Sequence, residues 1–237
     1  MKNLKAKLIA LTGSLLLAAC GDDRFPDYRY KMTIYVGDQA FSSVREVRQE
    51  EGSSIQSSSG KTLKTELTGE AVIIDLPSGK TVYALLARPD SADYGKYIAA
   101  AALTASLPKF TGDKAGDSLA DNAYQAQQMV EVLGPRELPR TRPSPDPVRQ
   151  PEPVKLWPFF VTFDDPTNPT TMREVSADNI GVQRITIEIT DEDTTTGIDK
   201  RLPSFGPETG FRKWYQSLPF GHPLQLSKTA FRTRPDQ

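Results

Sequence analysis

Apolar and polar residues alternate along several stretches of the chain. From Tyr28 to Val36 the even-numbered positions hold Tyr, Met, Ile or Val, and the same period of two recurs in "QRITIEITDED" at 183–193. This period is typical of strands that bury one face. Two apolar runs, 70–76 and 80–88, are separated by "PSG" and predict a hairpin buried on both faces, which we expect at the centre of the sheet.

Further strands are expected at 42–48, 156–163 and 170–175, the last two on either side of the turn-rich "DDPTNP". Helical spacing of small and apolar residues begins at Asp93, and a second helical stretch runs from Ser118 to the Gly-Pro pair that follows Leu133. Strands therefore dominate, with two helices between them. The predicted class is α+β, with a β-rich antiparallel sheet or sandwich and a proline-rich crossover.

The crossover is the segment 135–158, where eight of 24 residues are proline and several arginines are interleaved. Proline at this density interrupts both helices and sheet ladders, so irregular or polyproline coil is expected. A surface linker explains this composition, and a ligand for a partner or for the cell wall is the alternative. The segment separates an N-terminal β-rich part with two helices, 28–134, from a C-terminal β-rich part with a basic tail, 159–237.

The first 20 residues have the pattern of an export signal. Three lysines and no acid precede an apolar stretch from Leu8 to Ala19, which is too short to cross a bilayer. Leu17-Ala18-Ala19-Cys20 resembles the lipobox of bacterial lipoprotein precursors. The alternative is a plain secretory signal in which the cysteine stands at the cleavage point by chance.

The lipobox resemblance implies removal of residues 1–19 and attachment of lipid to Cys20, with 20–27 as a short lipidated tether. The membrane is then the first expected partner, and the bacterial cell envelope, facing the periplasm or the cell surface, is the expected location. Cys20 is the only cysteine. A lipidated chain would therefore have no thiol for a disulfide or a cysteine nucleophile.

Several segments resemble a group of uncharacterised proteobacterial lipoproteins. They are "FPDYRYKMT" near the start, "FDDPTNPTTMREV", "QRITIEITDED" and "GIDKRLP". This resemblance implies no activity and no catalytic residue, and it agrees with the expected lipid anchor.

Charge and histidine content limit the chemistry. The formal net charge is −1, and loss of three signal lysines would make it about −4, which argues against nucleic acid as a partner. His222 is the only histidine, so neither a zinc site nor a Ser-His-Asp site is indicated. No cofactor is predicted. Acidic clusters that include Asp164 and Asp191 leave open an envelope hydrolase that uses an Asp/Glu pair, although acids at strand ends are commonly turn formers.

The clearest sign of a binding surface is near the C-terminus. Arg212 and Lys213 stand among aromatic residues that include Trp214 and Tyr215, in a tail with a local excess of positive charge. Such a mixture can lie at a lipid headgroup interface or stack on glycan rings. The sequence thus favours a non-enzymatic binding or assembly component of the envelope, with an envelope protein or a glycan as a possible partner.

Overall fold

A computed structural model describes most of the chain. The described residues are 24–53, 55, 60–105, 107–109, 111–112, 118–206 and 210–234. The expected signal and Cys20 lie outside them.

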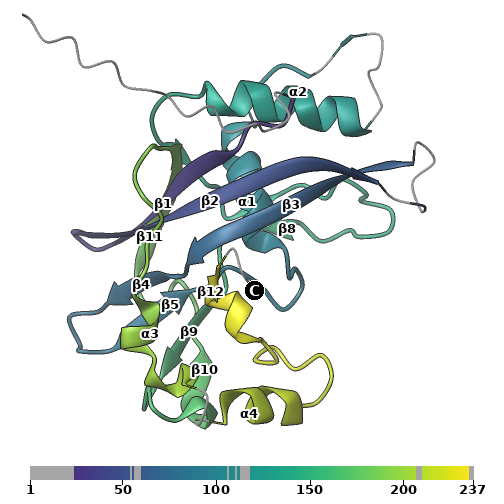
Figure 1. Ribbon diagram of the computed structural model, residues 1–237. Coiled ribbons are helices and arrows are strands. Elements are labelled where there is room, and N and C mark those ends of the chain that lie inside the picture. Colours follow the sequence, from purple (N-terminus) through teal and green to yellow (C-terminus); the bar gives the residue numbers. More distant parts are fainter. Residues whose placement is uncertain are drawn as a thin grey trace, which may run out of the picture.

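The larger of two main sheets has six antiparallel strands in the order β12-β3-β2-β1-β11-β6. Its long strands β1, β2 and β3 are seen side by side in Figure 1. Its strands are β1 (Tyr28–Val36), β2 (Gln39–Ser53), β3 (Lys61–Glu70), β6 (Arg136–Glu137), β11 (Val182–Ile189) and β12 (Arg232–Thr233). The strands predicted from the period of two form as β1 and β11, and β1 buries its apolar face as expected. Tyr30, Met32 and Ile34 of β1 are fully buried, and they lie opposite Ile189, Ile187 and Ile185.

The second sheet has four antiparallel strands in the order β10-β9-β5-β4. They are β4 (Val72–Asp75), β5 (Thr81–Ala84), β9 (Phe160–Phe163) and β10 (Met172–Glu174), and a separate short pair joins β7 (Thr141–Arg142) to β8 (Val154–Lys155). The β4–β5 hairpin forms as predicted, but its expected place at the centre of the sheet is wrong. β5 is an inner strand, because it pairs with β4 on one side and with β9 on the other, but among the described strands β4 pairs only with β5 and forms the edge of the sheet.

The helices cover different parts of the molecule. They are α1 (Tyr94–Leu103), α2 (Ser118–Val130), α3 (Ile198–Arg201) and α4 (Phe211–Ser217), with 3₁₀ turns η1 (Pro169–Thr171), η2 (Pro203–Phe205) and η3 (Lys228–Ala230). α1 contacts β3, β11 and α2, whereas α3 and α4 lie at the end occupied by the four-stranded sheet (Figure 1). Within the described ranges, none of these helices has the length and apolar character that crossing a membrane requires. The architecture is α+β with a β-rich antiparallel arrangement.

Two hydrophobic cores hold these layers together. The first lies between the six-stranded sheet and α1, and also takes in the inner face of the β4–β5 hairpin. The second is rich in aromatic rings: Phe205, Phe211 and Phe231 pack edge to face with ring centroids 4.8 to 6.2 Å apart. The cores meet where β3 continues into β4 through Ala71, whose backbone N–H donates to the carbonyl of Phe231, 2.7 Å away.

The proline-rich segment is not coil throughout, so the expectation for 135–158 is wrong at both ends. β6 pairs with β11 and extends the larger sheet, and Leu138 beside it is fully buried. At the other end Trp157 is buried, and its Nε1–H donates to the carbonyl of Leu138 across 2.9 Å. Both sheets draw strands from 28–134 and from 159–237, because β11 pairs with β1 and β9 pairs with β5.

The predicted tether is fixed to the body over its second half. Phe25 is 1% exposed, and Arg24 forms an ion pair of 2.8 Å with Glu51 of β2. Asp27 Oδ1 accepts a hydrogen bond of 3.1 Å from the backbone N–H of Gln49. Residues 24–27 therefore belong to the folded body.

Candidate functional site

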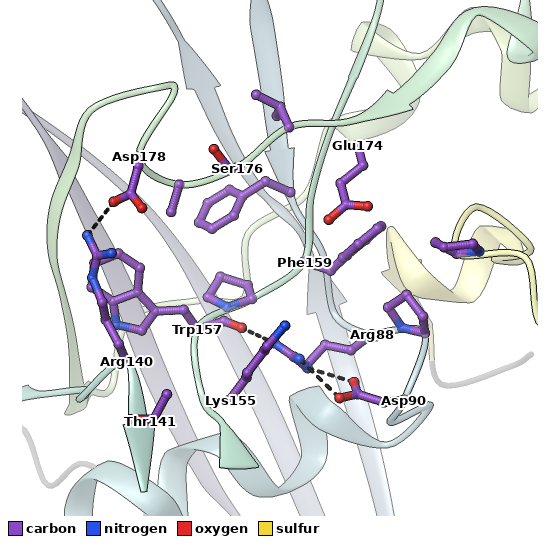
Figure 2. Close-up of a pocket in the computed structure, with 16 residues that line it drawn as sticks. Arg88, Asp90, Arg140, Thr141, Lys155, Trp157, Phe159, Glu174, Ser176 and Asp178 are labelled. Carbon is purple, nitrogen blue, oxygen red and sulfur yellow. Dashed lines mark hydrogen bonds and ion pairs between the residues drawn. The ribbon is translucent and has the colours of Figure 1, made fainter. Parts of the chain in front are cut away.

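A hollow of about 560 Å³ opens where β8, β9 and β10 meet the loop after β5 (Figure 2). Its volume lies in the range of small-ligand sites, about 300 to 1,000 Å³. Proline and aromatic side chains form its apolar surface, and charged side chains come from four separate segments. The residues that define this Trp157 hollow include Arg88, Arg140, Lys155, Trp157, Phe159 and Glu174.

Arg88 forms one fixed wall of the Trp157 hollow. Its Nε and Nη2 donate to the two carboxylate oxygens of Asp90 over 2.9 and 3.1 Å, and its Nη1 donates to the carbonyl of Trp157. Only 10% of the Arg88 side chain is exposed. These hydrogen bonds hold the pKa of Asp90 below its ordinary value, and the nearby charge of Lys155 adds to this effect. Asp90 is therefore an ionised partner of Arg88.

Arg140 forms the opposite wall by stacking on Trp157. Its guanidinium carbon lies 4.2 Å from the centroid of the indole ring. Its Nη2 is also 2.7 Å from Oδ1 of Asp178, and this hydrogen bond lowers the pKa of Asp178. A stacked and ion-paired guanidinium is restricted in orientation. This wall of the Trp157 hollow is therefore already ordered in the absence of a ligand.

Lys155 and Glu174 complete the polar lining. Both side chains are exposed, and within the part of the chain that the structure describes neither has a hydrogen-bond or ion-pair partner. Figure 2 shows them on opposite sides of Phe159, with Lys155 on the side of Arg88. A ligand in the Trp157 hollow would therefore meet one available cation and one available anion.

A second hollow of about 390 Å³ adjoins the first. Its lining includes Ala87, Tyr215, Phe220 and His222, and it shares Arg88 and Pro89 with the Trp157 hollow. We call it the Phe220 hollow. Phe220 is fully exposed, with a relative exposure of 101%, which is unusual for so large an apolar side chain.

The structure separates the four predicted binding residues of α4. Arg212 and Lys213 point to solvent, whereas Trp214 and Tyr215 are half-buried against the aromatic core. The rings of Trp214 and Tyr215 lie 5.7 and 5.9 Å from that of Phe211. Among the hollows described, Tyr215 is the one of the four that lines one, the Phe220 hollow. The binding role proposed for the four together stays a prediction.

The carboxylates of the hydrolase alternative do not share a hollow among those described. Asp164 lines a depression of about 260 Å³ with Tyr83 and Arg201, and it forms an ion pair with Arg173. Asp191 lines another, near Arg48 and Ile189. His222, the single histidine, lies in a turn, where its Nδ1 accepts a hydrogen bond of 3.1 Å from the backbone N–H of Leu224. In the described ranges we find no group of acids or histidines arranged to hold a metal ion.

Sequence reasoning missed the Trp157 hollow. Arg88, Arg140, Lys155 and Glu174 stand in four different segments of the chain, and no local motif links them. The available signal is the Trp-Pro-Phe-Phe run at 157–160, whose pattern predicts the end of the crossover and a strand but not a hollow. Comparison of the chain with protein-family models, with curated proteins and with solved structures gave no match. The lipobox and the similarity to proteobacterial lipoproteins therefore stay predictions, and the functional argument depends on the hollows themselves.

Proposed function

We propose that this chain is a lipid-anchored protein of the bacterial cell envelope that binds a ligand in the Trp157 hollow without transforming it. One observation carries the binding role: a concave site of small-ligand size whose charged walls are already fixed by their own partners. Preorganised walls lose little conformational freedom when a ligand binds, which favours affinity. The site would face the periplasm or the cell surface.

The proposed anchor is lipid on Cys20, which would leave the body close to the bilayer. Arg24 is ion-paired with Glu51 of β2 and Phe25 is buried, so only four residue steps separate Cys20 from the folded body. A fully extended chain covers about 14 Å over four steps. At about 0.8 kcal/mol per buried CH₂, two or more acyl chains would make release from the membrane negligible.

Binding is favoured over hydrolysis because of the positions of the carboxylates. A glycoside hydrolase needs two carboxyl groups about 5 to 9.5 Å apart on either side of the bond to be cleaved. Asp164 and Asp191 line different depressions. In the Trp157 hollow, Asp90 and Asp178 are held by arginines, which leaves Glu174 as the available carboxylate.

The anchor is tested by intact-mass analysis and fractionation of the protein expressed in a bacterial host. We expect a mature chain that begins at Cys20 and carries the mass of a diacylglyceryl group, and that sediments with membranes. The Cys20→Ser variant should lose the lipid mass and leave the membrane fraction. A wild-type protein with an unmodified thiol would contradict the anchor.

The binding role is tested by native mass spectrometry of the lipidated protein extracted from its envelope in mild detergent. We expect a bound small molecule in the wild type and its loss in Phe159→Ala. The matched control is Leu133→Ala, which should retain the adduct because it removes an exposed apolar side chain that lines neither the Trp157 hollow nor the Phe220 hollow. An adduct that survives Phe159→Ala, or a wild type without any adduct, would contradict the proposal.

A further inference from the structure

We infer that the Trp157 and Phe220 hollows form one groove that binds a short peptide with free charged ends. This inference rests on the proposed binding function and goes further by naming the class of ligand. In it, Lys155 takes the peptide carboxylate, Glu174 takes the ammonium group, and an apolar side chain occupies the Phe220 hollow.

The first argument is the charge balance of the groove. Arg88 is held by Asp90 and by the Trp157 carbonyl, and Arg140 is held by Asp178 and by the Trp157 ring. Lys155 and Glu174, on opposite sides of Phe159, remain available (Figure 2). An inorganic anion or a phosphate ester would satisfy Lys155 and be repelled by Glu174. A neutral sugar would leave both charges unpaired, whereas a zwitterionic ligand can neutralise both.

The second argument is the shape of the groove. The two hollows share Arg88 and Pro89, and the neighbours His222 and Pro223 line one hollow each. A ligand that extends beyond the charged pair thus reaches a second compartment, whose lining includes the aromatic side chains of Tyr215 and Phe220. Aromatic side chains give a large contact area at a low cost in conformational entropy. An extended peptide combines two terminal charges with side chains at regular intervals, so it matches both compartments.

The test uses the fluorescence of Trp157 in a Trp214→Phe background, in which Trp157 is the only tryptophan. The probes are alanine peptides of two to five residues that each contain one leucine, and each is prepared free, N-acetylated or C-amidated. We expect one length to bind best and each capped form to bind at least tenfold more weakly. Capping removes one of the two charges, so a ligand held by both charges must lose affinity in either capped form.

Variants separate the two charge contacts. Glu174→Gln should weaken the free peptide and abolish the effect of N-acetylation only, and Lys155→Met should abolish the effect of C-amidation only. Lys80→Met and Glu131→Gln change exposed residues outside both hollows and should bind like the parent. Equal binding of free and capped peptides would overturn the inference. The absence of peptide binding would also overturn it. If the native mass spectrum then shows an adduct that is not a peptide, the proposed binding function stands although the peptide inference fails.

Discussion

The guanidinium group of Arg140 lies over the indole ring of Trp157, with its central carbon 4.2 Å from the ring centroid, and the ring donates its N–H to the carbonyl of Leu138. Leu138 itself is buried beside β6. Arg140 of the Trp157 hollow is thus linked to the edge of the six-stranded sheet by two contacts, its own contact with Trp157 and the hydrogen bond from Trp157 to Leu138. The geometry of the hollow depends on the proline-rich segment that contributes all three residues.

Arg140→Ala should destabilise the fold by about 0.5–1 kcal/mol, because a partly exposed cation–π contact has this magnitude. In the Trp214→Phe background the emission of Trp157 should also shift to longer wavelength, since one face of the ring becomes hydrated. Asp178→Asn removes the ion pair but keeps the stack, so its stability should change by less than about 0.5 kcal/mol. Chemical denaturation with fluorescence detection checks both values, and identical spectra for the two variants would contradict the stacking argument.

The ion pair between Arg88 and Asp90 predicts a dependence of stability on pH. Hydrogen bonds from Arg88 lower the pKa of Asp90 in the folded protein, whereas in the unfolded chain the pKa of this carboxyl group is about 3.9. The contribution is therefore complete above the unfolded pKa, and it is lost as the pH falls through the lower, folded pKa. At pH 6 the wild type should exceed Asp90→Asn by about 0.5–1 kcal/mol in unfolding free energy, a small value because the carboxylate is exposed.

Denaturation midpoints at pH 6 and at pH 3 measure this difference. We expect the gap between the wild type and Asp90→Asn to narrow at the lower pH. A gap that widens there would mean that the Asp90 carboxylate is not the group held by Arg88.

The aromatic core at the end with α4 predicts a contrast between two phenylalanines. Phe231 is fully buried, and its ring contacts those of Phe205 and Phe211, so Phe231→Ala should cost about 3–5 kcal/mol. Phe220 is fully exposed, and Phe220→Ala should change stability by less than about 0.5 kcal/mol. Thermal and chemical unfolding of the two variants provide the comparison, and similar losses would show that Phe220 packs more firmly than the structure indicates.

Gly69, at the bend where β3 leads into β4, is predicted to be a position where any side chain lowers the stability of the fold. Its φ of +142° is strained for residues with side chains, and an added Cβ would lie 3.0 Å from Cγ and 3.1 Å from Cα of Arg45. Gly69→Ala should therefore destabilise by at least about 2 kcal/mol. Gly79→Ala is the matched control, because Gly79 has a φ of +81° in open space. It should cost only about 1 kcal/mol, and equal losses would contradict the predicted clash with Arg45.

Local patterns predicted most of the strands and both long helices. Alternation in β1 and β11 was readable because each buries one face, as Tyr30 and Ile187 show. The sequence patterns did not show which distant segments pair in the sheets. β6 forms because Arg136 and Glu137 find partners on β11, more than 40 residues away in the sequence. The high proline content concealed this strand.

The candidate site was predictable only in part, for a related reason. Tyr215 was singled out from the sequence and does line the Phe220 hollow, but its neighbour Trp214 packs on Phe211 instead. The charged residues of the Trp157 hollow come together only through the tertiary fold. Their chemical pairing, such as Arg88 with Asp90 and with the carbonyl of Trp157, depends on distances that no spacing in the sequence encodes.

Photocrosslinking in intact cells tests the central claim of ligand binding in the Trp157 hollow most directly. A benzophenone side chain at position 159 replaces one aromatic group by another inside the hollow, and the same group at the exposed position 80 serves as the control. After irradiation of cells that export the lipidated protein, mass spectrometry should find a defined adduct on the chain labelled at 159 and none at 80. Labelling at neither position, or the same adducts at both, would contradict a ligand site in this hollow.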